Sequence, residues 1–167
     1  MDKPERSPTG SRKRGAVYHV LALILLVIAT AAAAQAARVV DGDTLELVDA
    51  KRIRLWGIDA PEGAQTCQRA GRPWRCGDEA TAALLALVNG RELTCVEREI
   101  DRYGRIVATC TVNGEDIGAA MVRQGWALDF ERYSNGAYAA EQLEAEQAQR
   151  GLWSGSFVAP WEWRAAR

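Results

Sequence analysis

Residues 39–62 read VVDGDTLELVDAKRIRLWGIDAPE, and this stretch decides the fold that we expect. Apolar and polar side chains alternate over residues 44–48 and nearly as well over residues 52–58, with Asp49-Ala50-Lys51 between the two runs. Alternation with a period of two, interrupted by a short polar turn, predicts a β-hairpin. This hairpin would carry one arginine and three acids, namely Arg54, Asp43, Asp59 and Glu62.

The remaining pattern predicts a second hairpin and several helices. Residues 91–98 and 105–112 bracket the sequence DRYGR at 101–105 as two further strands. Apolar residues at helical spacing, with capping residues and terminal glycines, predict helices over residues 78–88, 116–124 and 137–150. This order is typical of an α+β fold with about five strands and about three helices. A five-stranded β-barrel is the economical closure because it hides the strand edges.

The 167 residues divide into three segments. Residues 1–36 carry a basic cluster ahead of an apolar run, which is typical of an export signal or, if it is not cleaved, of a membrane anchor. Residues 37–155 are expected to form one domain and residues 156–167 a tryptophan-rich, loop-like tail. We expect Trp153 and the tail tryptophans to pack on the body, with a binding platform as the alternative. We therefore expect a periplasmic or secreted monomer, which contacts a membrane only if the first segment is retained.

Four cysteines lie after the export segment, and three disulfide pairings of them are possible. The pairing Cys67–Cys76 would close a short surface loop, and Cys95–Cys110 would tie the two strands that flank DRYGR; we favour this pairing. A zinc site is the alternative, but no C-x-x-C spacing occurs and the sequence has a single histidine, His19, in the export segment. Disulfides agree with the oxidising compartment that export implies.

Charge and the missing histidines limit the chemistry. From Ala37 onward there are 16 lysines or arginines and 20 aspartates or glutamates, a net charge of about −4. The chain therefore lacks the basic character of a general nucleic-acid binder, and any such contact needs a local arginine cluster. With no histidine after the export segment, Ser-His-Asp and Cys-His schemes are excluded, and paired cysteines would also remove a thiolate nucleophile. Acid and base chemistry is left to carboxylates, arginines or metal-bound water.

The charged residues of the first hairpin allow two interpretations. Asp43, Asp59 and Glu62 offer the oxygen ligands that Ca²⁺ and Mg²⁺ prefer, although acids at turns are more often simply solvated. Arg54 lies mid-strand among apolar neighbours, where an unpaired charge is costly, so it needs an anionic partner. That partner is either one of these acids or a substrate phosphate. Residues 101–105 can likewise be an ordinary hairpin turn, although a turn does not require Arg105.

Five motifs in this order resemble the staphylococcal nuclease (thermonuclease) family. The motifs are VVDGDT at 39–44, RLWGIDAPE at 54–62, DRYGR at 101–105, MVRQGWA at 121–127 and GLW at 151–153. The resemblance covers about residues 38–154. It implies an OB-fold β-barrel with three helices, and an exported Ca²⁺-dependent phosphodiesterase or endonuclease that acts on DNA or RNA.

The resemblance also implies roles for the acids. Asp43 and Asp59 would bind Ca²⁺, with the main-chain carbonyl of Ala60 as a further ligand. Glu62 would orient the attacking water and take its proton. Asp101 would support the DRYGR turn.

Arginines and tyrosines would bind the substrate. By the same resemblance, Arg54 and Arg105 would hold the phosphate and offset the negative charge that grows in the transition state. Arg102 and Tyr103 would lie near the terminal phosphate or the sugar. Tyr133 matches one of two tyrosines that line the nucleotide pocket.

Some positions depart from the family pattern. Ala60 stands where the best-known member has threonine, and Glu131 takes the place of the first pocket tyrosine, which removes a stacking surface and adds a negative charge. Catalysis is therefore better supported than nucleotide specificity. The alternative is a catalytically idle OB-fold module that binds nucleic acid, glycan or protein at the cell envelope, which the acidic charge, Glu131 and the tryptophan-rich tail would suit.

Overall fold

The computed structural model of the protein describes residues 37–167; the expected export segment, residues 1–36, lies outside the described residues. The strands are β1 (Ala37–Asp41), β2 (Thr44–Leu47), β3 (Arg52–Leu55), β4 (Ile58–Asp59), β5 (Cys67–Arg69), β6 (Arg72–Trp74), β7 (Leu93–Ile100), β8 (Ile106–Val112), β9 (Glu115–Asp116) and β10 (Leu128–Asp129). The helices are α1 (Cys76–Val88), α2 (Ile117–Arg123), α3 (Glu131–Ser134), α4 (Ala139–Gln147), the 3₁₀ turn η1 (Gly151–Ser154) and α5 (Pro160–Ala165). The α+β class is therefore confirmed.

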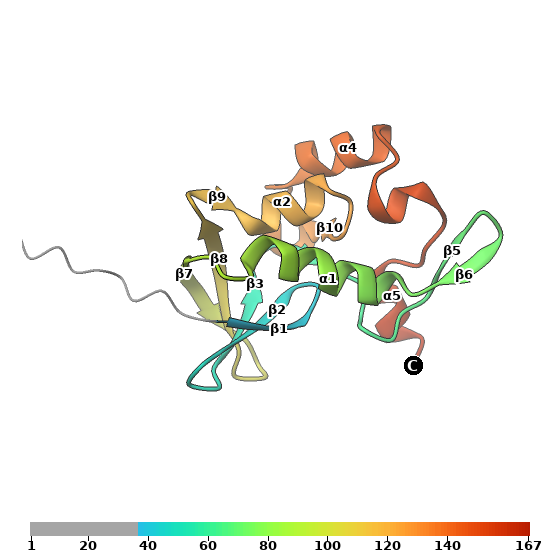
Figure 1. The fold of residues 1–167 in the computed structure, drawn as a ribbon. Helices are drawn as coiled ribbons and strands as arrows, with labels where there is room; N and C mark the ends of the chain where they lie inside the picture. Colours follow the sequence, from blue (N-terminus) through green and yellow to red (C-terminus); the bar gives the residue numbers. More distant parts are fainter. Residues whose placement is uncertain (1–36) are drawn as a thin grey trace, which may run out of the picture. The chain divides into compact units, whose positions relative to one another are not determined.

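The main sheet joins both expected hairpins (Figure 1). Its strands follow the order β1-β2-β3-β8-β7, with β9 added on β8; β3 and β8 run parallel and the other neighbours antiparallel. A closed barrel is not found among these strands, because β1 and β7 remain at the two ends of the path. Helix α1 contacts β1, and β7 carries exposed charged residues at 97–99, which discourage pairing with another strand.

The core lies between the sheet and the helices. Leu45, Ile53 and Leu55 from the first hairpin are almost fully buried, and Leu84 of α1 and Met121 of α2 meet them in one cluster. Burying one such side chain stabilises the fold by about 1.5–3 kcal/mol. Helix α2 contacts both α1 and α4 and lies between them in Figure 1. The rigid core thus supports both hairpins from one side.

The two expected disulfides are present: Cys67–Cys76 and Cys95–Cys110. The first joins the start of β5 to the start of α1, so the surface loop that it was expected to close contains the short β5–β6 hairpin. The second joins partners that face each other across β7 and β8. No helix among residues 37–167 has the length and apolarity needed to cross a membrane.

The tail differs from expectation because it contains a helix. Helices α3 and α5 bring the described helices to five, apart from η1, where about three were expected. Helix α5 begins with the buried Pro160, whose ring fixes a helical backbone angle at this position. The ring of Trp161 stacks on Phe130 at 5.2 Å between ring centroids. Contacts with the body therefore hold a helix that is too short to form on its propensity alone.

Candidate active site

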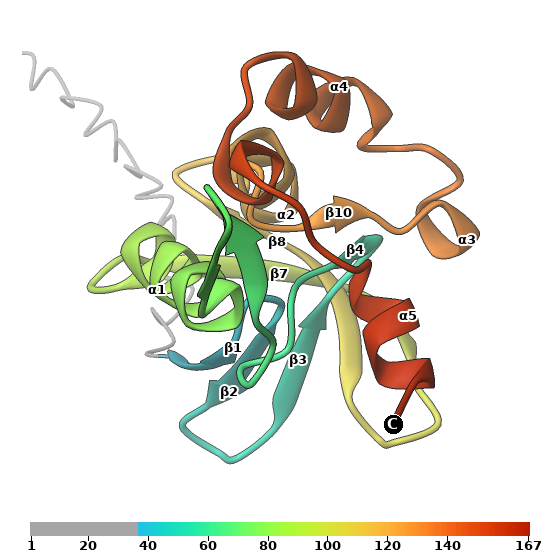
Figure 2. The same ribbon diagram turned by 90° about the vertical axis from the view of Figure 1, so that its right-hand side faces the viewer.

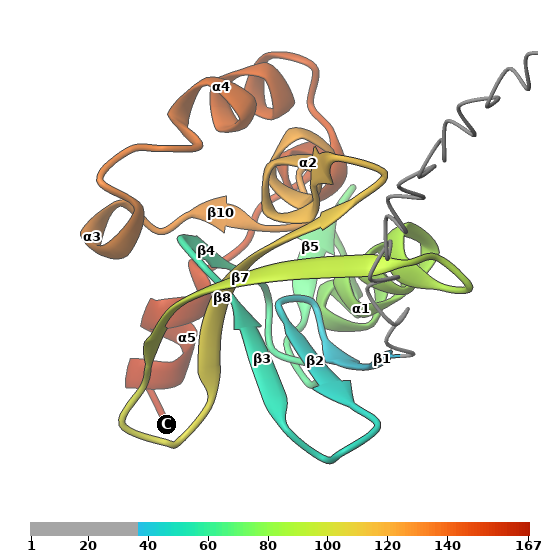
Figure 3. The same ribbon diagram turned by 90° about the vertical axis from the view of Figure 1, so that its left-hand side faces the viewer.

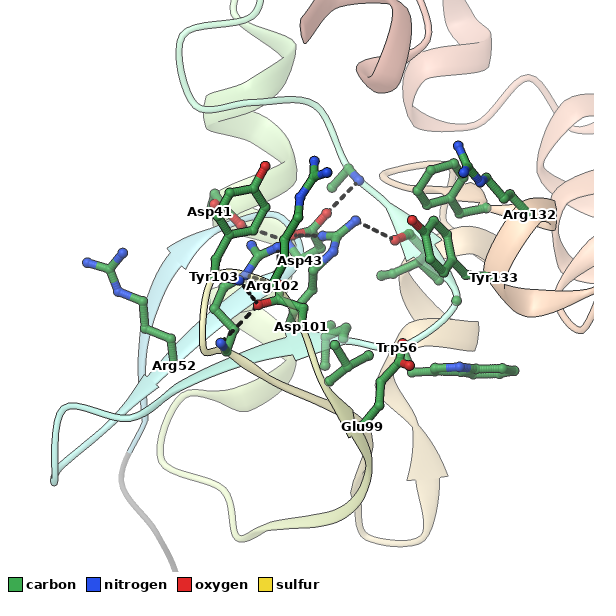
Figure 4. Close-up of a pocket in the computed structure, with 18 of the residues that line it drawn as sticks. Asp41, Asp43, Arg52, Trp56, Glu99, Asp101, Arg102, Tyr103, Arg132 and Tyr133 are labelled. Carbon is green, nitrogen blue, oxygen red and sulfur yellow. Dashed lines mark hydrogen bonds and ion pairs between the residues drawn. The ribbon is translucent and has the colours of Figure 1, made fainter.

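A cavity of about 880 Å³ opens beside the first hairpin, the β7–β8 turn, α3 and α5 (Figure 4). Figures 1 to 3 show the turns of the β2–β3 and β7–β8 hairpins at the same end of the sheet, and Figure 1 shows α5 apart from the β7–β8 turn. Eight of the nine expected catalytic, metal-binding and substrate-binding residues line the cavity, namely Asp43, Arg54, Ala60, Glu62, Arg102, Tyr103, Arg105 and Tyr133. The ninth, Asp59, is wholly buried and bonded to Arg54. The fold therefore gathers residues from both hairpins and from α3.

Arg54 bridges the two buried aspartates. Its Nη1 lies 2.5 Å from Asp43 Oδ1, and its Nη2 lies 2.8 Å from Asp59 Oδ1 and 3.1 Å from the carbonyl oxygen of Ile58. The side chains of Arg54, Asp43 and Asp59 are only 15%, 7% and 0% exposed. The anionic partners that the position of Arg54 required are thus these acids. Burial alone would raise the pKa of Asp43, but the charge and hydrogen bond of Arg54 hold it below its ordinary value.

The turn between β1 and β2 fixes Asp43. Its Oδ1 accepts a hydrogen bond from the Thr44 hydroxyl at 3.0 Å, and its Oδ2 accepts one from the backbone N–H of Ala60 at 3.0 Å. Gly42 is required beside it, because a Cβ there would lie 2.7 Å from the Cβ of Ala60. Asp41 lines the cavity next to Asp43, and burial together with the charge of Asp43 raises the pKa of Asp41 to about 6.

Glu62 projects from a backbone loop that a buried glutamine secures. The side chain of Gln65 accepts a hydrogen bond from the N–H of Glu62 at 3.3 Å and donates one to the carbonyl of Val158 at 2.8 Å. Gln65 is wholly buried, whereas the Glu62 side chain is 35% exposed. Glu62 is therefore held by its backbone while its carboxylate faces the cavity.

Gly77 provides a direct test of this support. A Cβ at Gly77 would overlap the carbonyl oxygen of Glu62, whereas a Cβ at Gly63 would meet no atom within 4 Å. We expect Gly77→Ala to lower the free energy of unfolding by about 1–3 kcal/mol, because backbone must move to admit the methyl group. Gly63→Ala, the control, should change it by less than about 0.5 kcal/mol. Urea unfolding followed by tryptophan fluorescence measures both, and equal effects would contradict the tight packing.

The β7–β8 turn presents Arg105. Asp101 Oδ1 accepts hydrogen bonds from the N–H groups of Tyr103 at 2.9 Å and Arg105 at 3.0 Å, and its Oδ2 lies 2.7 Å from Arg105 Nη2. Gly104 has a φ of 78°, which glycine adopts without strain. The guanidinium of Arg102 lies over the ring of Tyr103 at 4.8 Å. The Asp101 carboxylate therefore both holds the backbone of the turn and orients the side chain of Arg105.

Tyr133 stands across the cavity from Tyr103 (Figure 4). Its side chain belongs to α3, is exposed, and contacts Phe130 at 4.9 Å between ring centroids. Glu131, at the start of the same helix, is exposed and does not line the cavity. The aromatic wall on this side consists of Phe130 and Tyr133.

Arg164 of α5 is a residue of this cavity that the sequence did not reveal. Its Nη2 lies 2.8 Å from Asp59 Oδ2, and its Nη1 lies 3.1 Å from Asp59 Oδ1 and 2.8 Å from Glu62 Oε1. Burial raises the pKa of Asp59, and the hydrogen bond from Arg164 opposes that rise. The tail was expected to pack as a loop, and no spacing within it pointed to this contact.

Comparison with known proteins decides the family. The family model described as "Staphylococcal nuclease homologue" matches residues 52–155, which is more than half of the chain. The chain belongs to the staphylococcal nuclease family. The protein is thus a nuclease, of the hydrolase class. Asp43 and Arg164 fall on either side of the matched range, so the match alone does not cover the whole cavity.

Relatives of this nuclease carry different names. An "Uncharacterized endonuclease" of Escherichia coli is 40% identical over 133 residues, which are 76% of this chain and 81% of that protein. The "Succinoglycan biosynthesis protein ExoI" of Rhizobium meliloti (strain 1021) is 35% identical over 156 residues, 90% of this chain and 81% of that protein. The "Staphylococcal-like nuclease CAN1" of Arabidopsis thaliana is 38% identical over 115 residues, 68% of this chain and 33% of that protein.

The buried aspartates of this nuclease offer oxygen donors that suit a hard cation, but they form ion pairs with Arg54 and Arg164. Among residues 37–167, no three or more acidic, histidine or cysteine side chains are arranged to hold a metal ion. The carboxyl groups of Asp41, Asp43 and Asp59 nevertheless supply the oxygen donors that Ca²⁺ takes. Burial and, after it, the charge of Asp43 raise the pKa of Asp41. The donor set therefore fits a hard cation by its chemistry, and a bound cation would also offset the negative charge that Asp43 places beside Asp41.

Proposed function

We propose that this nuclease is an exported, Ca²⁺-dependent phosphodiesterase that hydrolyses DNA or RNA with a water activated by Glu62. The observation that carries the proposal is the convergence of Arg54, Asp43, Asp59, Glu62 and Arg105 around one cavity. These residues come from two separate hairpins, and structural stability alone does not require their meeting. They combine a base, phosphate-binding cations and oxygen ligands for a metal.

Asp43, Asp59 and the main-chain carbonyl of Ala60 would hold the cation. When bound, Ca²⁺ would neutralise the buried aspartates and polarise the scissile phosphate. Asp43 is already oriented for this role by Thr44 and by the N–H of Ala60. Asp43 would thus be presented from the β1–β2 turn, and Asp59 and Ala60 from the end of β4.

Glu62 would act as the general base. Its carboxylate accepts a proton from a water molecule while the oxygen of that water forms a bond to phosphorus, and the bond from phosphorus to one ester oxygen breaks. Arg54 and Arg105 would donate hydrogen bonds to the phosphate oxygens, whose charge increases in the transition state. The guanidinium fork suits such bidentate contacts.

The walls of the cavity would position the nucleotide. Arg102 and Tyr103 would lie near a phosphate or sugar, and Tyr133 beside a base, since aromatic rings stack on bases of any sequence. The strand path β1-β2-β3-β8-β7 supports an OB-like scaffold for this surface. The two disulfides support an oxidising compartment outside the cytosol. We expect the protein to act as a monomer.

Metal removal is the direct test of this function. Plasmid and single-stranded DNA should be cleaved by the full chain with Ca²⁺, and excess chelator should slow cleavage by at least about 100-fold, since a buried charge cluster loses its neutralising cation. Adding back Ca²⁺ should restore the rate. Cleavage that is insensitive to chelator would refute the cation's role, and binding of DNA without turnover would favour a catalytically idle module.

A further inference from the structure

Arg164 fills the positions on Asp59 from which a cation would be held. An ionised carboxylate offers about four lone-pair directions on its two oxygens. Oδ1 of Asp59 accepts from both Arg54 at 2.8 Å and Arg164 at 3.1 Å, and Oδ2 accepts from Arg164 at 2.8 Å. The Asp59 side chain has no exposed surface that could offer a free direction to solvent. Arg164 spans both oxygens of Asp59, so a cation that takes this bidentate position must replace the contacts of Arg164.

The same arginine also holds Glu62. Nη1 of Arg164 lies 2.8 Å from Oε1 of Glu62, so one guanidinium joins the proposed base to a proposed metal ligand. A guanidinium beside a divalent cation at the same carboxylates would suffer like-charge repulsion in a partly buried setting. The two positive groups are therefore alternatives at this position.

The helix that carries Arg164 is packed on the body by its first residues, Pro160 and Trp161, whereas Arg164 and Ala165 near its end are exposed. Helix α5 has six residues, Trp161 stacks on Phe130 with an angle of 1° between the rings, and Gln65 reaches the preceding segment through the carbonyl of Val158. A helix of this length has little stability of its own. Segments with few buried contacts open at low free energy, so the exposed end of α5 can leave the site while the core stays folded.

We propose that Arg164 occupies the cation position of the active site in the metal-free protein, so that docking of α5 and binding of Ca²⁺ oppose each other. The inference rests on the proposed function, because it takes Asp59 as a metal ligand and Glu62 as the base. Coupling between two binding events is reciprocal, so loss of the Arg164 contact strengthens Ca²⁺ binding, and Ca²⁺ loosens α5 to the same extent.

Calorimetric titration of the full chain with Ca²⁺ tests whether loss of the Arg164 contact strengthens Ca²⁺ binding. Arg164→Met should bind Ca²⁺ at least about fivefold more tightly than the wild type, within the range usual for coupled sites. Trp161→Ala keeps the arginine but removes the stack on Phe130, and should shift affinity in the same direction. Arg132→Met is the matched control: Arg132 lines the cavity and has the same charge, but it contacts no acid within salt-bridge distance in the described chain. It should change affinity by less than about twofold.

Hydrogen exchange of residues 160–165 tests whether Ca²⁺ loosens α5, without any activity measurement. Ca²⁺ should speed exchange in the wild type, whereas in Arg164→Met exchange should be fast already and insensitive to Ca²⁺. Slower exchange with Ca²⁺, or weaker Ca²⁺ binding by Arg164→Met, would overturn the inference and make Arg164 a support for the cation site. If all variants bind Ca²⁺ equally while cleavage still needs Ca²⁺, the inference fails and the proposed function stands. Absence of Ca²⁺ binding in every variant refutes both.

Discussion

Glu62→Gln is expected to slow DNA cleavage by about 10²–10⁴-fold, because an amide cannot take a proton from the attacking water. The fold should survive, since the Glu62 side chain is 35% exposed and its backbone is held by Gln65 and Gly77 independently of the carboxylate. The pairing with Arg164 is partly solvated, so its loss should change the free energy of unfolding by less than about 1 kcal/mol. Initial rates at saturating Ca²⁺ and DNA, together with urea unfolding, measure the two effects separately.

Glu99→Gln provides the control for charge. Glu99 lines the same cavity but lies near Trp56 (Figure 4), away from Asp43, and its side chain is exposed. The substitution makes the same change in charge and shape, and the cleavage rate should stay within about threefold of the wild type, as expected for an exposed charge screened by salt. A Glu62→Gln protein that cleaves at the wild-type rate would remove Glu62 from the mechanism. Equal losses in both variants would indicate a general electrostatic effect.

Local patterns were sufficient to predict the hairpins and the disulfides. Alternation over residues 44–48 and 52–58 reports burial on one face of a strand, and burial of Leu45, Ile53 and Leu55 follows from it. The requirement that Arg54 have an anionic partner is likewise local, because it depends only on a charge among apolar neighbours. Whether that partner is an acid or a phosphate depends on how close the turn at Asp43 and the strand at Asp59 come to Arg54. Only the structure shows that both acids form ion pairs with Arg54.

The tail could not be predicted because its contacts are long-range. Arg164 and Asp59 are 105 positions apart, and neither residue carries a local signal of the other. A six-residue helix also has too little intrinsic stability for propensity to identify it, so α5 depends on the stack of Trp161 on Phe130. The open sheet has a similar origin: hydrophobic alternation predicts strands, but whether β1 meets β7 depends on how α1 covers the edge.

The acidic net charge does not conflict with a nuclease once the cavity is considered separately. Six arginines and five acids line it, namely Arg52, Arg54, Arg102, Arg105, Arg132 and Arg164 with Asp41, Asp43, Glu62, Glu99 and Asp101, so the lining is slightly positive although the chain is acidic. The acidic residues elsewhere, such as Glu141 and Glu144 of α4, pair with Arg123 on a different part of the surface. A phosphate therefore meets a local concentration of guanidinium groups, which the total charge does not report. Binding should accordingly weaken as salt concentration rises.

Arg54→Met is expected to combine the largest loss of stability with a loss of activity. Removing Arg54 leaves Asp43 buried without its cationic partner and takes one of two partners from Asp59. Breaking a buried ion pair from one side destabilises by about 3–5 kcal/mol. Losing a phosphate-binding donor should slow cleavage by a further factor of about 10²–10³ at temperatures where the variant remains folded. Urea unfolding gives the first quantity, and rates at saturating DNA give the second.

Arg52→Met separates this effect from the loss of any arginine on β3. Arg52 lies two residues away on the same strand, lines the cavity, and pairs at 3.4 Å with Glu46 on an exposed surface. Its loss should change the free energy of unfolding by less than about 1 kcal/mol, because exposed pairs contribute little. Arg54→Lys keeps the charge, but one ammonium cannot bond both aspartates or bind a phosphate with two parallel donors. Relative to Arg54→Met, the free energy of unfolding should therefore recover more than the cleavage rate. Full recovery of both in Arg54→Lys would show that only charge at this position matters, and an Arg54→Met protein as stable as Arg52→Met would contradict the buried bridge between Asp43 and Asp59.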